Sequence, residues 1–191
     1  MTEKAVFLDR DGVLNRLIFN PDTGEFESPH KVEDLEVFPE TGGALLKLQE
    51  KNFLLLLVSN QPSFAKGKTS LEEIKRIQAR FHEKMLELGV RFSRYYYCYH
   101  HPNGIVPEFT GPCHCRKPGI KFLEEAREEF KIDFSSSWMV GDRNSDIICG
   151  KRAGLKTILI LESEEKEKFC ETPPDFSVSD LSEAVKIIIR S

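Results

Sequence analysis

Short apolar runs alternate with amphipathic stretches along most of this chain, and this alternation constrains the fold more than any other feature. Apolar runs typical of buried strands fall at residues 5–8, 53–58, 95–99, 138–140 and 157–161. Helical patterns fall at residues 41–51, 70–89, 118–130, 144–153 and 182–189. Strands that alternate with helices predict an α/β fold, with a doubly wound, mostly parallel sheet covered by helices on both faces.

Length and composition predict one domain that spans residues 1–191. Hydrophobic residues make up 40% of the chain and charged residues 30%, so one substantial core can form. The net charge of −4 argues against nucleic acid as a partner. No apolar window approaches the roughly 18 residues of a membrane span, and the N-terminus MTEKAVFLDR lacks the order of a secretory signal. We therefore expect a cytoplasmic protein without a membrane partner, and we expect a monomer.

Polar side chains follow the predicted strands at the points where those strands end. They are Asp9 and Asp11 in FLDRDGVLN, then Ser59, Asn60 and Asp142. Ligands of open parallel sheets bind outside the carboxyl ends of the strands, so these side chains should converge on one edge. An aspartate pair alone could be a surface feature, a turn or part of a calcium loop. Convergence with the other polar residues favours half of a catalytic site.

Four short motifs, in this order, resemble those of the haloacid dehalogenase superfamily of phosphohydrolases: Asp9-x-Asp11, Ser59-Asn60, Lys117 and Gly141-Asp142. The resemblance spans roughly residues 5–161 and implies a Rossmann-like phosphatase fold. By this resemblance Asp9 is the nucleophile that forms an aspartyl-phosphate, and Asp11 shuttles the proton. Ser59 would donate its hydroxyl to a phosphoryl oxygen, and Lys117 would supply a fixed positive charge.

The resemblance also implies a magnesium ion, because an anionic nucleophile approaches an anionic phosphate only when charge is neutralised. Its ligands would be the carboxylates of Asp9 and Asp142 and the backbone carbonyl of Asp11. Asn60 would orient the phosphate or the neighbouring loop. Two interpretations of Asp146 are open: an exposed helix residue, or a residue that orients the catalytic lysine or a metal-bound water.

A cysteine and histidine cluster precedes this lysine, in a predicted zinc loop of about residues 98–115. Four of its side chains could form a tetrahedral zinc site: Cys98, His100, Cys113 and Cys115. His101 and His114 are rival ligands, and reduced thiols without a metal are the alternative. Similarity to heptose bisphosphate and histidinol phosphatases of the same superfamily implies His100 as the ligand and zinc as the metal.

A closed four-ligand zinc site leaves no open position for substrate, so its role would be structural. We expect zinc to hold the loop that carries Arg116 and Lys117. Cys149 and Cys170 have no partner ligands nearby in the sequence, and we interpret both as ordinary thiols. The charged segment of residues 162–168 is typical of a solvated loop or helix end.

Substrate selection should depend on loops, because the intervals between the motifs leave no room for a large cap domain. Three segments remain for this role: residues 17–20, residues 61–67 and the zinc loop. Beside Asn60, the predicted substrate contacts are Gln61, Arg116 and Arg143. Arg116 suits a second anionic group, because a guanidinium can contact phosphate or carboxylate with two hydrogen bonds.

The strongest similarity is to the D-glycero-D-manno-heptose-1,7-bisphosphate 7-phosphatase group, through FLDRDGVLN, SNQ, CRKP and GDR. Where that group reads TNQSG and A-R-G, this chain reads SNQPS and AKG, and residues 20–31 are also atypical. The resemblance implies removal of the 7-phosphate, with histidinol phosphate or another small sugar phosphate as the alternative substrate. Two alternatives of another class are a non-catalytic binding module, which the intact catalytic set disfavours, and a nucleic-acid end phosphatase, which the acidic charge disfavours.

Overall fold

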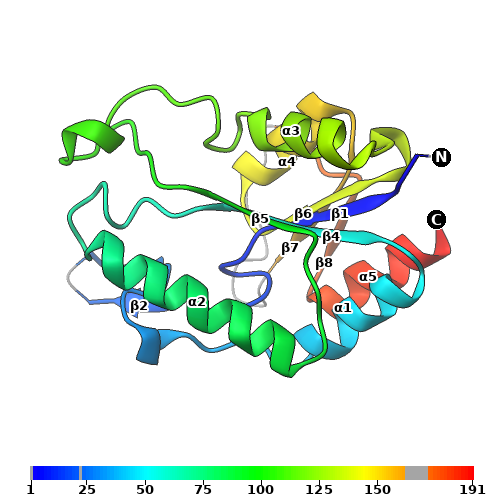
Figure 1. Ribbon diagram of the computed structural model, residues 1–191, viewed down its shortest axis with the longest axis horizontal. Helices are drawn as coiled ribbons and strands as arrows, with labels where there is room; N and C mark the ends of the chain where they lie inside the picture. Colours follow the sequence, from blue (N-terminus) through cyan, green and yellow to red (C-terminus); the bar gives the residue numbers. More distant parts are fainter. Residues whose placement is uncertain (1, 22, 162–171) are drawn as a thin grey trace.

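The fold is built on a six-stranded sheet between two layers of helices (Figure 1). The computed structural model describes residues 2–21, 23–161 and 172–191. All neighbouring strands of the sheet are parallel, in the order β5-β4-β1-β6-β7-β8. The strands are β1 (Ala5–Leu8), β4 (Leu54–Asn60), β5 (Arg94–Cys98), β6 (Trp138–Gly141), β7 (Lys156–Ile160) and β8 (Phe176–Val178). The prediction of a doubly wound parallel sheet is therefore confirmed.

Helices cover both faces of the sheet. On one face lie α1 (Thr41–Glu50), α2 (Leu71–Glu87) and α5 (Leu181–Arg190), and on the other lie α3 (Lys121–Phe130) and α4 (Asn144–Ala153). Strand β1 is fully buried, and its side chains alternate between two cores. Val6 and Leu8 belong to the core on the side of α1, whereas Ala5 and Phe7 belong to the core on the side of α3. Burial on both faces explains why β1 is apolar at every position.

Three short elements were not predicted from the sequence. They are β8 and a separate antiparallel hairpin of β2 (Ile18–Asn20) and β3 (Glu25–Glu27). Each has only three residues, and a period of two cannot be recognised over so short a run. Single turns of 3₁₀-helix are η1 (Val32–Asp34), η2 (Pro107–Phe109) and η3 (Phe134–Ser136).

The start of α3 differs from the prediction. A helix was expected from residue 118, but α3 begins at Lys121. The preceding residues form a turn, in which the backbone N–H of Gly119 donates to the carbonyl of Arg116 at 2.7 Å. This turn directs the chain from Lys117 into the helix.

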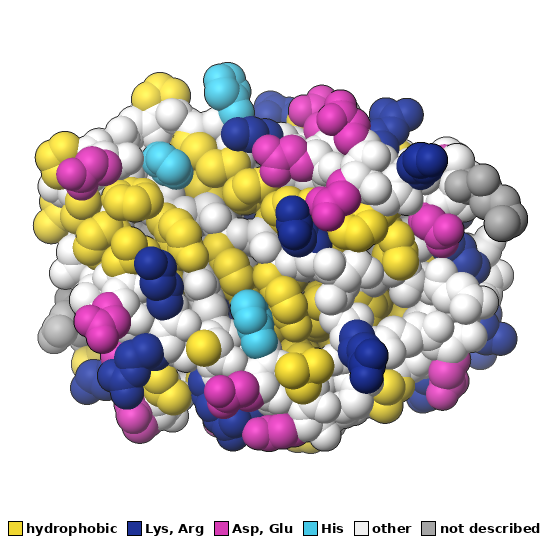
Figure 2. Space-filling model, in the orientation of Figure 1, with side chains coloured by type: hydrophobic (Ala, Val, Ile, Leu, Met, Phe, Trp, Pro, Cys, Tyr) yellow, Lys and Arg dark blue, Asp and Glu magenta, His cyan; other side chains and the backbone are white. Residues whose placement is uncertain are grey.

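The described residues contain no cap domain, in agreement with the prediction, and the hairpin is the main insertion between β1 and α1. Their helices include none with the length and apolar character that a membrane span requires. Acidic and basic side chains are interspersed over the face drawn in Figure 2, which has no continuous basic stripe. The segment of residues 162–168 and Cys170 lie outside the described residues.

Candidate active site

The carboxyl ends of the central strands bring the predicted catalytic residues together. Asp9 follows β1, Asp142 follows β6, and Lys117 approaches from the loop before α3. The Nζ atom of Lys117 lies 3.0 Å from Oδ1 of Asp9. Carboxylate oxygens of Asp9, Asp142 and Asp146 lie within 4.8 Å of one another. Residues that are far apart in the sequence therefore share one small volume.

Lys117 is buried and contacts three oxygen acceptors. Its ammonium donates to the carbonyl of Val58 at 2.6 Å and pairs with Asp9 and with Oδ1 of Asp146, the last at 2.7 Å. Burial alone would lower the pKa of Lys117, but Asp146 and Asp9 outweigh burial and raise that pKa well above its ordinary value. The lysine is therefore a permanent cation. Asp146 is also buried, so its interpretation as an exposed helix residue is wrong.

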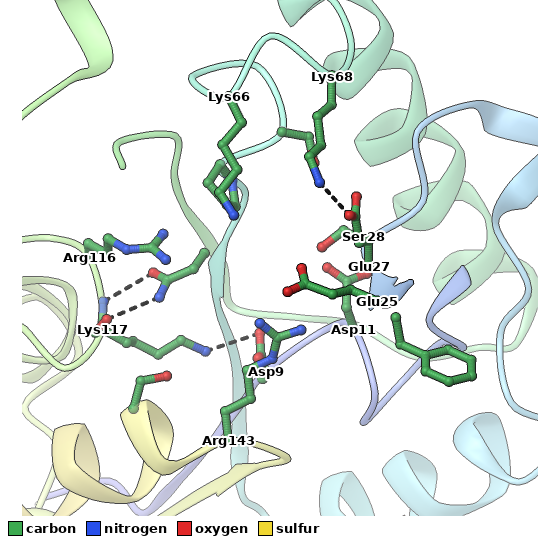
Figure 3. Close-up of a pocket in the computed structure, with 15 residues that line it drawn as sticks. Asp9, Asp11, Glu25, Glu27, Ser28, Lys66, Lys68, Arg116, Lys117 and Arg143 are labelled. Atoms are coloured by element: carbon green, nitrogen blue, oxygen red, sulfur yellow. Dashed lines mark hydrogen bonds and ion pairs between the residues drawn. The ribbon is translucent and has the colours of Figure 1, made fainter. Parts of the chain in front are cut away.

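Asn60 fixes the backbone of Lys117. The Asn60 side chain accepts from the Lys117 N–H at 3.0 Å and donates through Nδ2 to the Lys117 carbonyl at 3.1 Å (Figure 3). Because this amide satisfies both backbone polar groups of Lys117, the end of β4 and the lysine loop are held in register.

Asp11 is held by a buried network that the sequence did not reveal. Arg10, which is completely buried, donates to both carboxylate oxygens of Asp11 at 3.0 and 3.2 Å. Asn15 donates to the same carboxylate at 3.0 Å and Gln61 at 2.6 Å. Burial raises the pKa of Asp11, but Arg10, Asn15 and Gln61 outweigh burial and lower it. The network therefore keeps this carboxylate charged and oriented.

Gln61 and Ser59 are buried at the end of β4. Gln61 donates to Oγ of Ser59 at 2.9 Å as well as to Asp11, and it accepts from Arg10 at 3.0 Å. Neither Gln61 nor Ser59 is among the residues that line the pocket. In this arrangement Gln61 supports the Asp11 network, and its predicted contact with substrate stays a prediction.

Two glycines allow the acidic groups to approach closely. Gly12 has a φ of +81°, and a Cβ at this position would lie 2.5 Å from Oδ2 of Asp142. A Cβ at Gly141 would collide with the side chain of Asp146. At Gly12 only glycine adopts the positive φ without strain, and at both positions the absence of a Cβ leaves room for a neighbouring carboxylate.

The carboxylates fit a hard divalent cation. Asp9, Asp142 and Asp146 are all buried and offer oxygen donors, which is the donor type that magnesium prefers. Burial raises the pKa of Asp9 more than nearby Lys117 lowers it. Lys117 and Arg143, whose Nε lies 3.8 Å from Oδ2 of Asp142, are two cations beside three buried carboxylates. Negative charge is therefore still in excess, and a divalent cation would offset it. Asp142 and Asp9 are the predicted ligands, and Lys117 pairs with both Asp9 and Asp146.

The predicted zinc ligands also lie together. The four ligand atoms of Cys98, His100, Cys113 and Cys115 are within 4.8 Å of one another. Sγ of Cys98 lies 3.9 Å from Nδ1 of His100 and 3.9 Å from Sγ of Cys113. A tetrahedron with Zn–S distances of about 2.3 Å has edges of about 3.8 Å, which these two separations match. Sγ of Cys115 lies closer, at 2.7 Å from Sγ of Cys113 and 3.3 Å from Sγ of Cys98, so this thiol would have to move outward for zinc to bind.

The rival histidines do not belong to this cluster, since neither His101 nor His114 is in the metal-ligand group. His101 instead accepts from the backbone N–H of Asn103 at 3.1 Å. All described cysteines are free of disulfides, Cys149 included.

A pocket opens above the carboxylates (Figure 3). Predicted site residues that line it are Asp9, Asp11, Asn60, Arg116, Lys117 and Arg143. The hairpin contributes a further side of the pocket through Glu25, Phe26, Glu27 and Ser28, and the loop after β4 contributes Lys66 and Lys68. Sequence reasoning missed the hairpin, although Gly24 between two aromatic residues was a usable turn signal.

Relatives of known name match this chain along most of its length. A "D-glycero-alpha-D-manno-heptose-1,7-bisphosphate 7-phosphatase" from Photorhabdus laumondii is 34% identical, over 94% of this chain and 97% of the relative. The chain belongs to the haloacid dehalogenase (HAD)-like phosphatase family. A family model described as "HAD-hyrolase-like" matches residues 114–184. The corresponding heptose bisphosphate phosphatase of Chlorobaculum tepidum is 35% identical, over 95% of this chain and 92% of the relative.

Structural comparison agrees with this family at the level of the fold. The crystal structure of D,D-heptose 1,7-bisphosphate phosphatase from B. bronchiseptica, complexed with magnesium and phosphate, superimposes with a TM-score of 0.78. The alignment covers 98% of each chain at 20% identity. The two proteins thus share the same overall fold.

Proposed function

We propose that this HAD-like chain is a magnesium-dependent phosphomonoester hydrolase that removes the 7-phosphate of D-glycero-D-manno-heptose 1,7-bisphosphate. The observation that carries the proposal is the buried Lys117, paired with Asp9 beside Asp142 and Asp146 at the floor of an open pocket. Relatives named for this activity match nearly the whole chain, which supports the choice of substrate.

In the proposed mechanism, a carboxylate oxygen of Asp9 attacks phosphorus and the bond from phosphorus to the leaving oxygen breaks. Asp11 takes up a proton because the approaching anionic phosphoryl group raises its pKa, and it gives this proton to the leaving oxygen. Water then attacks the phosphorus of the aspartyl-phosphate, Asp11 takes a proton from this water, and Asp9 is released. The proton that Asp11 lost in the first step is thus replaced in the second.

The charged groups of the site make this approach possible. Lys117 neutralises Asp9 and the incoming phosphoryl group, and Asn60 keeps the lysine backbone in place. Magnesium held by Asp9, Asp142 and the Asp11 carbonyl would supply further positive charge at the phosphoryl oxygens. Arg143 lines the same pocket as Asp9 and is proposed to contact the same phosphate (Figure 3). Ser59 is proposed to donate its hydroxyl to a phosphoryl oxygen.

We propose that zinc at the cysteine and histidine cluster serves positioning. Arg116 donates to the carbonyl of His100 at 3.1 Å, so the loop that carries Arg116 is tied to a ligand residue. The same cluster ends two residues before Lys117, because its last ligand is Cys115. Zinc would thereby hold the arginine at the pocket mouth and the lysine at its floor.

The proposal is tested by phosphate release from p-nitrophenyl phosphate with magnesium, and then from a substrate panel. The panel contains heptose 1,7-bisphosphate, hexose phosphates and histidinol phosphate. Asp9→Asn should reduce turnover at least about 10³-fold, because an amide oxygen is a poor nucleophile. Asp133→Asn is the matched control, since Asp133 does not line the pocket and its N–H donates to the carbonyl of Glu3, beside the amino end of β1. Equal rates for Asp9→Asn and wild type would refute hydrolysis through Asp9.

The panel also decides the substrate. We expect the highest kcat/KM for heptose 1,7-bisphosphate. A higher value for histidinol phosphate would refute the proposed substrate and leave the phosphatase mechanism in place.

A further inference from the structure

The β2–β3 hairpin is fixed at the mouth of the pocket. Glu27 of β3 pairs with Lys68 and with Nε2 of His30, the latter at 3.1 Å, and it accepts from Oγ1 of Thr23 at 2.8 Å. Burial raises the pKa of Glu27, but hydrogen bonds led by that from Lys68 outweigh burial and lower it to about 2. Glu27 is therefore an anchor: it ties the hairpin to the segment that leads into α2.

Other hydrogen bonds strengthen this attachment. Oγ1 of Thr69 donates to the carbonyl of His30 at 3.0 Å. The N–H of Val32 donates to the carboxylate of Glu73 in the first turn of α2 at 3.1 Å. The hairpin and the chain after it are thus attached to α2 at several points, and its side chains have a defined place relative to the pocket.

Glu25 is the hairpin carboxylate that is not used in this anchoring. It lines the pocket, and Figure 3 shows its carboxylate directed into the space above Asp11. Within the described part of the chain, no ion pair is formed by Glu25, in contrast to Glu27. Its carboxylate can therefore accept hydrogen bonds from a ligand, because both of its oxygens carry lone pairs.

The opposite side of the pocket is basic. Lys66 and Arg116 line it, and in Figure 3 both side chains face the space that Glu25 enters. Among described residues, neither has a carboxylate within ion-pair distance. Burial, followed by the neighbouring charges of Lys68 and Arg116, lowers the pKa of Lys66. Two cations that repel each other in a pocket favour an anionic ligand between them.

The loop of Lys66 is held by the zinc loop. The N–H of Ile105 donates to the carbonyl of Ala65 at 2.6 Å, and the rings of Phe64 and Phe109 pack at 5.3 Å. The basic side of the pocket is thus held by the zinc loop, and the acidic side is carried by the β2–β3 hairpin. The acidic and basic side chains therefore hold fixed places on opposite sides of the pocket mouth.

We infer that Glu25 is a specificity-determining residue, which accepts hydrogen bonds from hydroxyl groups on the carbon chain of the phosphate ester. This inference rests on the proposed phosphatase function and adds the substrate class and its orientation. An acceptor-only carboxylate attracts hydroxyl donors and repels a second phosphate, so a bisphosphate orients its distal phosphate toward Lys66 and Arg116. The site therefore suits a polyhydroxylated ester with a second anionic group.

The test compares Glu25→Ala with wild type on two esters. Heptose 1,7-bisphosphate carries hydroxyls and a second phosphate, whereas p-nitrophenyl phosphate has neither. A hydrogen bond to a charged group contributes about 1.5–3 kcal/mol, which corresponds to a loss in kcat/KM of about ten- to a hundredfold. We expect a loss of at least tenfold for the heptose ester, mainly in KM, and a loss at least fivefold smaller for p-nitrophenyl phosphate.

Glu33→Ala is the matched control, because Glu33 is exposed and does not line the pocket. It should not change the ratio of the two kcat/KM values. A similar loss for both esters, or no loss for either, would overturn the inference while wild-type hydrolysis still supported the proposed function. Absence of hydrolysis by wild type would overturn the proposed function and this inference together. If wild type prefers another hydroxylated ester, that ester replaces the heptose and the same ratio decides.

Discussion

Asp146 should control turnover although it is predicted to make no contact with the substrate. Its carboxylate lies 2.7 Å from the Lys117 ammonium, which also lies 3.0 Å from Asp9. In Asp146→Asn, an amide oxygen still accepts from the lysine, but half of the balancing charge is lost. The ammonium should then be drawn toward Asp9, which makes this carboxylate a weaker nucleophile. We expect kcat to fall about ten- to a hundredfold, a barrier increase of about 1.4–2.7 kcal/mol.

Stability should fall as well, by an amount that the geometry limits. Removal of one partner of a buried ion pair costs about 3–5 kcal/mol when the other charge is left alone. Here Asp9 still balances Lys117, so a loss of about 1–3 kcal/mol is expected. Part of this loss comes from the start of α4, where the N–H of Arg143 donates to Asp146 at 3.0 Å. Asp146→Ala should lose more, because it also removes the acceptor.

Saturating p-nitrophenyl phosphate with magnesium measures kcat, and urea denaturation measures the free energy of unfolding. Asp133→Asn provides the same chemical change outside the pocket and should not alter kcat. Asp133 caps η3 by accepting from the N–H of Ser135, and because asparagine caps as well as aspartate does, the loss of stability should be small. A folded Asp146→Asn protein with kcat within twofold of wild type would show that the charge on Asp146 does not act through Lys117.

Three further predictions concern the zinc cluster, the hairpin and the nucleophile turn. Cys113→Ser should lose both zinc, measured by atomic absorption, and activity, whereas Cys149→Ala should keep zinc. Full turnover in the zinc-free protein would contradict a positioning role for zinc. Because the pKa of Glu27 lies near 2 in place of 4.5, its carboxylate adds stability above about pH 4.5 that is lost as the pH falls toward 2. The free energy of unfolding of Glu27→Gln, measured by urea denaturation, should therefore be about 1–2 kcal/mol below that of wild type at pH 7, and this difference should shrink at pH 3. A difference that is the same at both pH values would refute this. Gly12→Ala should cost at least about 1 kcal/mol of stability and most activity, because its Cβ would collide with Asp142; wild-type kinetics would contradict this.

The sheet was predictable because its central strands are buried on both faces. Burial of every residue of Ala5–Leu8 leaves an uninterrupted apolar run, which a sequence displays directly. The β2–β3 hairpin leaves no comparable apolar run in the sequence, because its strands have only three residues each and because Phe19 and Phe26 are more than half exposed. Its place at the pocket depends on an ion pair with Lys68, more than 40 residues away.

The catalytic cluster was predictable as a set of positions at strand ends, but its internal contacts were not. Arg10 looked like a spacer between two aspartates, and its role depends on Gln61, which is 51 positions away. Asp146 could not be assigned from the sequence, because its burial depends on close packing against Gly141. Such contacts follow from the packed backbone and leave no local pattern.

The three acceptors around Nζ of Lys117 also limit which amino acid this position can carry. One carbonyl and two carboxylates surround a compact ammonium, at 2.6, 3.0 and 2.7 Å from Nζ. The planar, five-donor guanidinium of arginine is too wide to fit between these three acceptors and cannot direct its hydrogens toward all of them. Replacement by a residue of equal charge would therefore still disrupt the site: shape restricts this position as strictly as charge does.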